Sequence, residues 1–188
     1  MENEKNGDDF LPKNYEVPVT GGGYMKIKDG ENKIRIMESP ILGYEYWNTE
    51  KKPIRSKEPF AVTPTDIQIG LDGKPGKIKH FWAMIIWNYA DEEIQILEII
   101  QTSIQSTIRN LAKDDDWGHP KNYDIKITRK GDKLTTEYIV TAVPPKPMSK
   151  DILDAYEAKK PIVLEALYEG GNPFEHSGSG DNKSDLPF

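Results

Sequence analysis

Aromatic side chains interleaved with lysine and arginine are the residues of this chain whose types and spacing best suit the binding of a ligand. Nucleobases stack on aromatic faces for about 1–3 kcal/mol each, and nearby cations attract phosphates without reading the base sequence. The pattern therefore predicts a groove that follows an unpaired nucleic-acid strand. It occurs in three clusters: Tyr24 with Lys26 and Lys28; Tyr44, Tyr46 and Trp47 with Lys51, Lys52, Arg55 and Lys57; and Lys77 and Lys79 with Phe81 and Trp82.

Burial in a core is the alternative for each of these aromatic side chains. Trp82 and Trp87 lie on opposite faces of one apolar segment, so at least one of them is expected in a core. Tyr44, Tyr46 and Trp47 border the basic cluster, and their positions suit either role.

Catalytic and metal chemistry are not indicated. The three histidines, His80, His119 and His176, are isolated in the sequence and lack partners at metal-ligand spacing. The run Gly21-Gly22-Gly23 is not followed by a helix, as a phosphate-binding loop would be. The run Asp114-Asp115-Asp116 fits a solvated turn better than a cation site, which needs oxygens from more than one segment. We therefore predict no enzyme activity, no metal site and no cofactor.

Composition and charge indicate one domain with acidic ends. The 188 residues are 36% hydrophobic and 30% charged, which suits one core with tails. The net charge of −6 is uneven, because residues 1–10 hold four acids and one lysine, and residues 151–188 hold eight acids and three lysines. Acidic terminal segments are expected in a protein whose ends must not bind the ligand of its central part. Neither a cysteine nor an apolar run of about 20 residues is present, so a soluble, cytoplasmic protein is expected.

The body of the chain has the periodicity of strands separated by turns. Alternating apolar residues place Met25, Ile27, Ile34 and Ile36 on an inward face. The low hydrophobicity from Pro59 to Gly76 predicts an exposed loop. Strands are expected at 24–28, 33–37, 42–47, 79–89, 95–100, 123–130 and 134–143, the last two joined by a turn at Gly131-Asp132.

Helices are predicted at three places. Thr102 and Gln105 have the spacing of a capping box, and the apolar period that follows continues to Lys113. Ser149 can cap a second helix, and Pro161 can open a third.

These elements fit a mainly β chain of the oligonucleotide-binding (OB) type: a five-stranded, partly open barrel with a short helix between strands and helices after it. A β-sandwich has a similar number of strands and remains an alternative. The expected organisation is a flexible arm over 1–20, an OB-fold domain over 21–147, a short helical extension over 148–169 and a disordered acidic tail over 170–188.

Two stretches resemble the single-stranded DNA-binding proteins of tailed bacteriophages. The first is Lys28-Asp29-Gly30-Glu31-Asn32-Lys33-Ile34-Arg35-Ile36, followed by Ser39-Pro40-Ile41 and Gly43-Tyr44-Glu45-Tyr46-Trp47. The second runs from Ile96 through Ser106 to Asp116-Trp117-Gly118 and Tyr123-Asp124-Ile125. The similarity spans about residues 20–148 and consists of short motifs.

The resemblance implies an OB-fold protein that coats and protects single-stranded DNA, without sequence specificity, during phage DNA replication, recombination and repair. It is compatible with a homo-oligomer or a cooperative assembly on the strand. The chain lacks the cysteines that hold zinc in the T-even phage helix-destabilising protein, so no metal dependence is implied. The expected phosphate path is Lys26, Lys28, Lys33, Arg35, Lys52, Arg55, Lys57 and Lys79, and the expected stacking residues are Tyr44, Tyr46, Trp47 and Phe81.

The last residues, Asp185-Leu186-Pro187-Phe188, are similar to the acidic Asp-x-Pro-Phe tips of bacterial single-stranded DNA-binding proteins, which recruit replication and repair enzymes. This similarity implies that a helicase, polymerase or nuclease binds the tip. Few acids precede it, so the apolar Leu186 and Phe188 are expected to matter more than the charge of the tail.

A protein of another class remains as an alternative. An adaptor would use the barrel and the tail to bridge replication or recombination enzymes, with little or no binding of DNA. Unchanged tryptophan fluorescence on titration with oligo-dT, together with tail-dependent binding of a partner, would indicate the adaptor.

Overall fold

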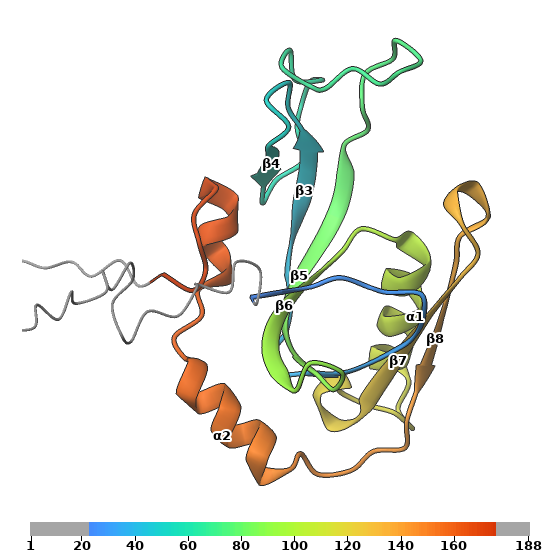
Figure 1. Ribbon diagram of the computed structural model, residues 1–188, viewed down its shortest axis with the longest axis vertical. Helices are drawn as coiled ribbons and strands as arrows, with labels where there is room; N and C mark the ends of the chain where they lie inside the picture. The colour runs from blue at the N-terminus through green and yellow to red at the C-terminus, as the bar shows by residue number, and fades with distance from the viewer. Residues whose placement is uncertain (1–22, 176–188) are drawn as a thin grey trace, which may run out of the picture.

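The computed structural model describes residues 23–175 (Figure 1). The predicted arm over 1–20 and the tip Asp185-Leu186-Pro187-Phe188 lie outside the described residues. The described elements are β1 (Tyr24–Met25), β2 (Gly30–Ile36), β3 (Ile41–Trp47), β4 (Pro53–Ser56), β5 (Lys79–Asn88), β6 (Glu93–Ile99), α1 (Thr102–Lys113), η1 (Pro120–Asn122), β7 (Asp124–Lys130), η2 (Lys133–Thr135), β8 (Glu137–Ala142), α2 (Lys150–Lys159) and η3 (Leu164–Glu169).

All eight described strands belong to one mixed sheet. The hydrogen-bonded order is β1-β6-β5-β2-β7-β8, with β3 paired to β5 and β4 paired to β3. β1 runs parallel to β6, whereas the other pairs are antiparallel. In the described part of the chain, β1 and β8 end this order without pairing to each other, so the barrel stays partly open. The mainly β, OB-like fold is therefore confirmed. The sheet has eight strands and not the five of the expected barrel, and β4 is the one that lies outside the seven predicted strand segments.

The inner face of the curved sheet forms the first core together with α1. Figure 1 shows α1 within the curve, between β5–β6 on one side and β7–β8 on the other. Ile104 and Ile108 of α1 are buried in a cluster with Ile34, Met84 and Ile125 of the sheet. The apolar period of α1 thus fills the barrel from one side.

α1 has the predicted bounds but not the predicted cap. Its N-cap residue is Gln101, and no side chain caps the first turn. The Gln105 side chain instead donates hydrogen bonds to the carbonyl oxygens of His80 (3.1 Å) and Ile99 (2.8 Å). The predicted capping box was therefore wrong, because the buried Gln105 amide satisfies its donors on the carbonyl oxygens of His80 and Ile99.

The outer face of β5 and β6 forms a second core with the C-terminal extension. Its strand residues include Phe81, Ala83, Ile85, Ile94 and Ile96, and its extension residues are Ile152, Tyr156, Leu164 and Leu167. The hydroxyl of Ser149 accepts the N–H of Ile152 at 3.4 Å, so the predicted cap of α2 is present. Trp82 packs on the first core and Trp87 on the second, which confirms that they lie on opposite faces.

β3 and the start of β5 extend beyond the barrel, at the top of Figure 1. This extension is called the arm below and is distinct from the predicted N-terminal arm. The loop at the end of this arm is tied down by isolated bridges between Asn48 and Ile67 and between Ile69 and Pro75. Gly43 is required within the arm, because a Cβ there would lie 2.5 Å from the carbonyl oxygen of Ser56.

Residues 170–175, which were expected to begin the tail, pack against the body. Gly170 ends η3 in the left-handed conformation, with φ of 70°. The N–H of Val163 donates to the carbonyl of Pro173 at 2.9 Å. The Phe174 ring meets Tyr24 edge to face, with 6.1 Å between centroids. The folded body therefore reaches at least Glu175.

Candidate nucleic-acid interface

A groove of about 410 Å³ lies at the open seam of the barrel, where side chains of β1, β3, β4, β6, β7 and β8 meet. A second groove of about 400 Å³ lies next to it, because Tyr24, Arg55 and Glu98 line both. We call these two neighbouring grooves together the seam channel. Its aromatic and basic residues are Tyr24, Lys26, Trp47, Lys52, Arg55, Arg129 and Tyr138.

Three aromatic side chains are available in the seam channel. Trp47, at the end of β3, is 49% exposed, and Tyr24 in β1 is 39% exposed. Tyr138 of β8 is half-buried against the first core. Burial, then the charge of Glu98, raises the pKa of Tyr24, and Arg55 opposes this shift, so the phenol stays neutral at physiological pH. Neutral aromatic faces that keep one side open can stack on bases.

Cations of the seam channel differ in how strongly they are engaged. Lys26 is exposed and makes no ion pair with the described residues. The guanidinium of Arg55 is held by Glu45 (3.2 Å) and Glu98 (2.7 Å). Arg129 pairs with the exposed Asp29 at 2.9 Å. Lys26 and Arg129 are thus the cations best placed to meet a phosphate, since breaking an exposed pair costs little.

Glu45 shows what holds Arg55 in place. Burial raises the pKa of Glu45, although Arg55 opposes that shift by its charge and its hydrogen bond. The guanidinium therefore compensates the buried Glu45 carboxyl as well as Glu98, and it also packs 5.6 Å from the Phe81 ring. Arg55 forms part of the channel wall.

The structure brings four of the sequence-predicted site residues together in the seam channel: Lys26, Trp47, Lys52 and Arg55. Lys52 is exposed and pairs with Glu50 at 2.9 Å. Lys28, Lys57 and Lys79 are exposed but do not line this channel.

Three predicted site residues are buried, and their assignment to an exposed strand path was wrong. Phe81 is fully buried in the second core, because its strand position faces the C-terminal extension. Tyr46 lies under Phe60, and its hydroxyl donates to Asp66 at 2.8 Å. Arg35 is 2% exposed.

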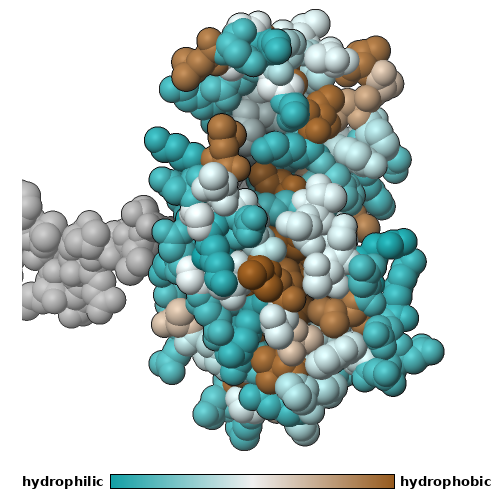
Figure 2. Space-filling view, turned by 90° about the vertical axis from the view of Figure 1, so that its right-hand side faces the viewer, coloured by the Kyte–Doolittle hydropathy of each residue, from teal (hydrophilic) through white to brown (hydrophobic). Residues whose placement is uncertain are grey.

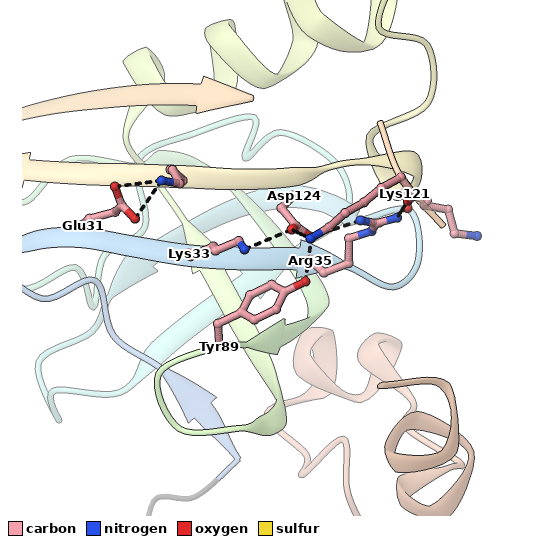
Figure 3. A network of polar contacts seen from close by, with 8 residues as sticks. Glu31, Lys33, Arg35, Tyr89, Lys121 and Asp124 are labelled. Carbon is pink, nitrogen blue, oxygen red and sulfur yellow. Dashed lines mark hydrogen bonds and ion pairs between the residues drawn. The ribbon is translucent and has the colours of Figure 1, made fainter. Parts of the chain in front are cut away.

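Arg35 and Lys33 belong to a network around Asp124, which is fully buried (Figure 3). Arg35 Nη1 lies 3.0 Å and the Tyr89 hydroxyl 2.8 Å from Asp124 Oδ1. Lys33 Nζ lies 3.2 Å from Oδ2 and 4.2 Å from the centre of the Tyr89 ring. Lys146 Nζ is also 3.2 Å from Oδ2. The two basic residues of β2 thus compensate a buried carboxylate.

Tyr44 lies on another face of the arm. Its ring is 5.2 Å from that of His80, whose Nε2 accepts a hydrogen bond from Trp82 Nε1 at 3.2 Å. A separate apolar groove of about 490 Å³, bordered by Leu42, Trp82 and α1, lies on this side. Figure 2 looks from the side of Figure 1 on which α1 and β8 lie, and shows apolar side chains along its middle with polar ones around them.

Sequence reasoning missed Arg129 and Tyr138 as channel residues. They face each other as cross-strand partners in the β7–β8 hairpin, so an aromatic and a basic side chain lie side by side. Pairing the two strands around the predicted turn at Gly131 would have brought them together.

Two further findings concern residues 23–175. No helix in this part is long and apolar enough to cross a membrane. Within the same residues, no three His, Asp or Glu side chains gather in a way that could hold a metal ion.

Comparison with known proteins gives one relative. The chain is similar to a protein of Escherichia phage T5 named as a probable ssDNA-binding protein, with 25% identity over 151 residues. The match covers 66% of this chain and spans 58% of the length of that relative. No family model matches, and no solved structure matches. The comparison confirms the resemblance to a phage single-stranded DNA-binding protein at modest identity.

Proposed function

We propose that this chain binds single-stranded DNA in the seam channel, without sequence specificity. The observation that carries the proposal is the convergence of Trp47, Tyr24 and Tyr138, from three separate strands, on one groove that also holds Lys26 and Arg129. Bases would stack on the aromatic faces, and the cations would follow the phosphates. The name of the phage relative supports the same ligand.

The proposed action is passive and needs no bond chemistry. Binding the unpaired strand more tightly than a duplex would melt hairpins and shield the strand during phage DNA replication, recombination and repair in the host cytoplasm. The aromatic faces of the channel can stack on any base, which fits binding without sequence specificity.

The first prediction concerns the ligand itself. The full chain should retard a single-stranded oligonucleotide in a gel shift at a concentration that leaves the matched duplex free. The logarithm of the association constant should fall linearly with the logarithm of salt concentration, by about 0.7 for each phosphate contacted. Equal affinity for the single strand and the duplex, or an affinity that does not change with salt concentration, would refute the proposal.

The second prediction concerns the tip. Because residues 170–175 pack on the body, the informative truncation removes only Leu186 to Phe188. It should leave strand binding unchanged or slightly tighter, and it should abolish the capture of a helicase, polymerase or nuclease that the full chain captures. The matched control replaces Asn182 by alanine, which leaves the tip intact. A truncated chain that still captures the same enzyme would disprove recruitment through the tip.

A further inference from the structure

A hollow of about 660 Å³ lies beside the Asp124 network and shares no lining residue with the seam channel. It is lined by Arg35, Lys121, Asn122, Pro145, Lys146, Pro147 and Met148. Three of these seven residues are cationic, and none is acidic. The prolines bring no N–H donors, so the polar character of the hollow is dominated by positive charge.

The charge around Asp124 is unbalanced. One fully buried carboxylate faces the guanidinium of Arg35 and the ammonium groups of Lys33 and Lys146, all within 3.2 Å. One cation suffices to compensate one carboxylate, so two positive charges are in excess. Like charges this close repel, and partial burial makes the repulsion stronger than in water. An anion at the mouth of the hollow would relieve it.

Of the two excess cations, Lys146 lines the hollow and can reach a ligand there, whereas Lys33 does not line it. The Lys146 side chain is 51% exposed and that of Lys33 is 30% exposed, whereas Asp124 has no exposed surface. Lys121 is exposed at the rim of the hollow. The carboxylate is thus sealed inside, and the positive groups are the ones that meet solvent. Figure 3 shows Arg35 between Asp124 and the backbone carbonyl of Lys121.

The hollow is also held rigid. Arg35 Nε donates to the carbonyl of Lys121 (2.9 Å) and Nη2 donates to the carbonyl of Lys146 (2.6 Å). The N–H of Lys146 donates to the carbonyl of Asn122 at 3.1 Å. The two segments that carry the exposed lysines are therefore fixed by one buried guanidinium, and a fixed site loses little entropy when it binds an anion.

We propose that this hollow is a phosphate-binding site, in which Lys121 and Lys146 contact the phosphate oxygens by charge-assisted hydrogen bonds. The phosphate belongs either to the backbone of a bound strand or to a free phosphate compound. In the first case the inference rests on the proposed function and extends the strand beyond the seam channel.

The test compares the full chain with the double variant Lys121→Gln, Lys146→Gln, which keeps the backbone contacts of both residues. The control is Lys74→Gln, Lys133→Gln, which removes the same charge from two exposed positions that line neither the hollow nor the seam channel. One arm measures the salt dependence of binding to a long oligo-dT. The other measures the thermal unfolding midpoint with inorganic pyrophosphate, against sodium chloride at equal ionic strength.

For a strand phosphate, the site variant should lose about 0.7–1.4 from the salt slope, the value for one or two phosphate contacts, and the control variant should not. For a free phosphate, pyrophosphate should raise the midpoint of the native chain and of the control but not of the site variant. If the site variant matches the control in both arms, the phosphate site is refuted. If the native chain ignores the oligonucleotide but responds to pyrophosphate through these lysines, the proposed function fails and the site stands.

Discussion

Replacing Trp47 by alanine is expected to weaken the binding of a single strand by about 1–3 kcal/mol, which corresponds to about 5- to 150-fold in the dissociation constant. Trp47 is half-exposed at the end of β3 and presents its ring to the seam channel. Its removal takes away a stacking face without opening a cavity in a core. The measurement is a fluorescence-anisotropy titration of labelled oligo-dT at constant salt.

Two variants control this prediction. Trp47→Phe keeps an aromatic face and should retain most of the affinity. Leu42→Ala removes a comparably exposed apolar side chain that borders the apolar groove beside α1, and it should leave the affinity unchanged. Equal losses of affinity in Trp47→Ala and Leu42→Ala would show that the strand does not bind preferentially in the seam channel. A loss of affinity confined to Leu42→Ala would show that the strand binds in the groove beside α1.

Replacing Asp124 by asparagine is expected to lower the free energy of unfolding by about 3–5 kcal/mol, because it leaves the buried guanidinium of Arg35 without its counter-charge. The substitution keeps the shape of the side chain, so the loss reports charge and not volume. Arg35 would be the most affected partner, since it is buried and cannot regain hydration. Urea denaturation, with the slope of the transition checked for constancy, measures the change.

The matched control is Glu31→Gln, which removes a carboxylate from an exposed pair with Lys126 at 3.1 Å. Exposed pairs contribute about 0–1 kcal/mol, so this variant should stay close to the native chain. A loss as large as that of Asp124→Asn would show that both variants act through general charge and not through the buried network.

The stability of the network also has a defined pH dependence. Burial raises the pKa of Asp124, but hydrogen bonds from Tyr89 and Arg35, together with the ammonium groups of Lys146 and Lys33, outweigh burial and lower it below the ordinary value. A carboxyl with a lowered pKa stabilises the fold fully above its unfolded pKa of about 3.9, and this stabilisation is lost as the pH falls towards the folded pKa. The native chain should therefore lose stability over that acidic range, and Asp124→Asn should lack this component.

Local patterns predicted the elements whose signal is contained within them. α1 has the expected bounds because its apolar period is complete, and Lys79 to Tyr89 was expected as a central strand because it is apolar on both faces. A strand was expected at 24–28, but only Tyr24–Met25 (β1) forms one, and β4 was not expected. β1 is a strand because it pairs with β6, some 70 residues away, and no residue within β1 predicts that pairing.

The site was only partly predictable for a related reason. Lys26 and Arg35 have the same appearance in the sequence, each flanked by apolar residues in a strand. What separates them is Asp124, which lies 89 positions beyond Arg35 and draws it into the interior. Phe81 differs from Trp47 in the same way, since the extension that buries it follows far along the chain. Composition identified the kinds of residue, and long-range packing decided which of them remain available.

The two-sided burial of β5 and β6 has a consequence for how the chain can be divided. A fragment that ends at residue 147 would keep every strand, and by strand content it would look complete. It would nevertheless expose Phe81, Ala83, Ile85 and Ile96 as one apolar patch, and such a patch promotes aggregation. The shortest fragment suited to expression or crystallisation therefore extends through Glu175.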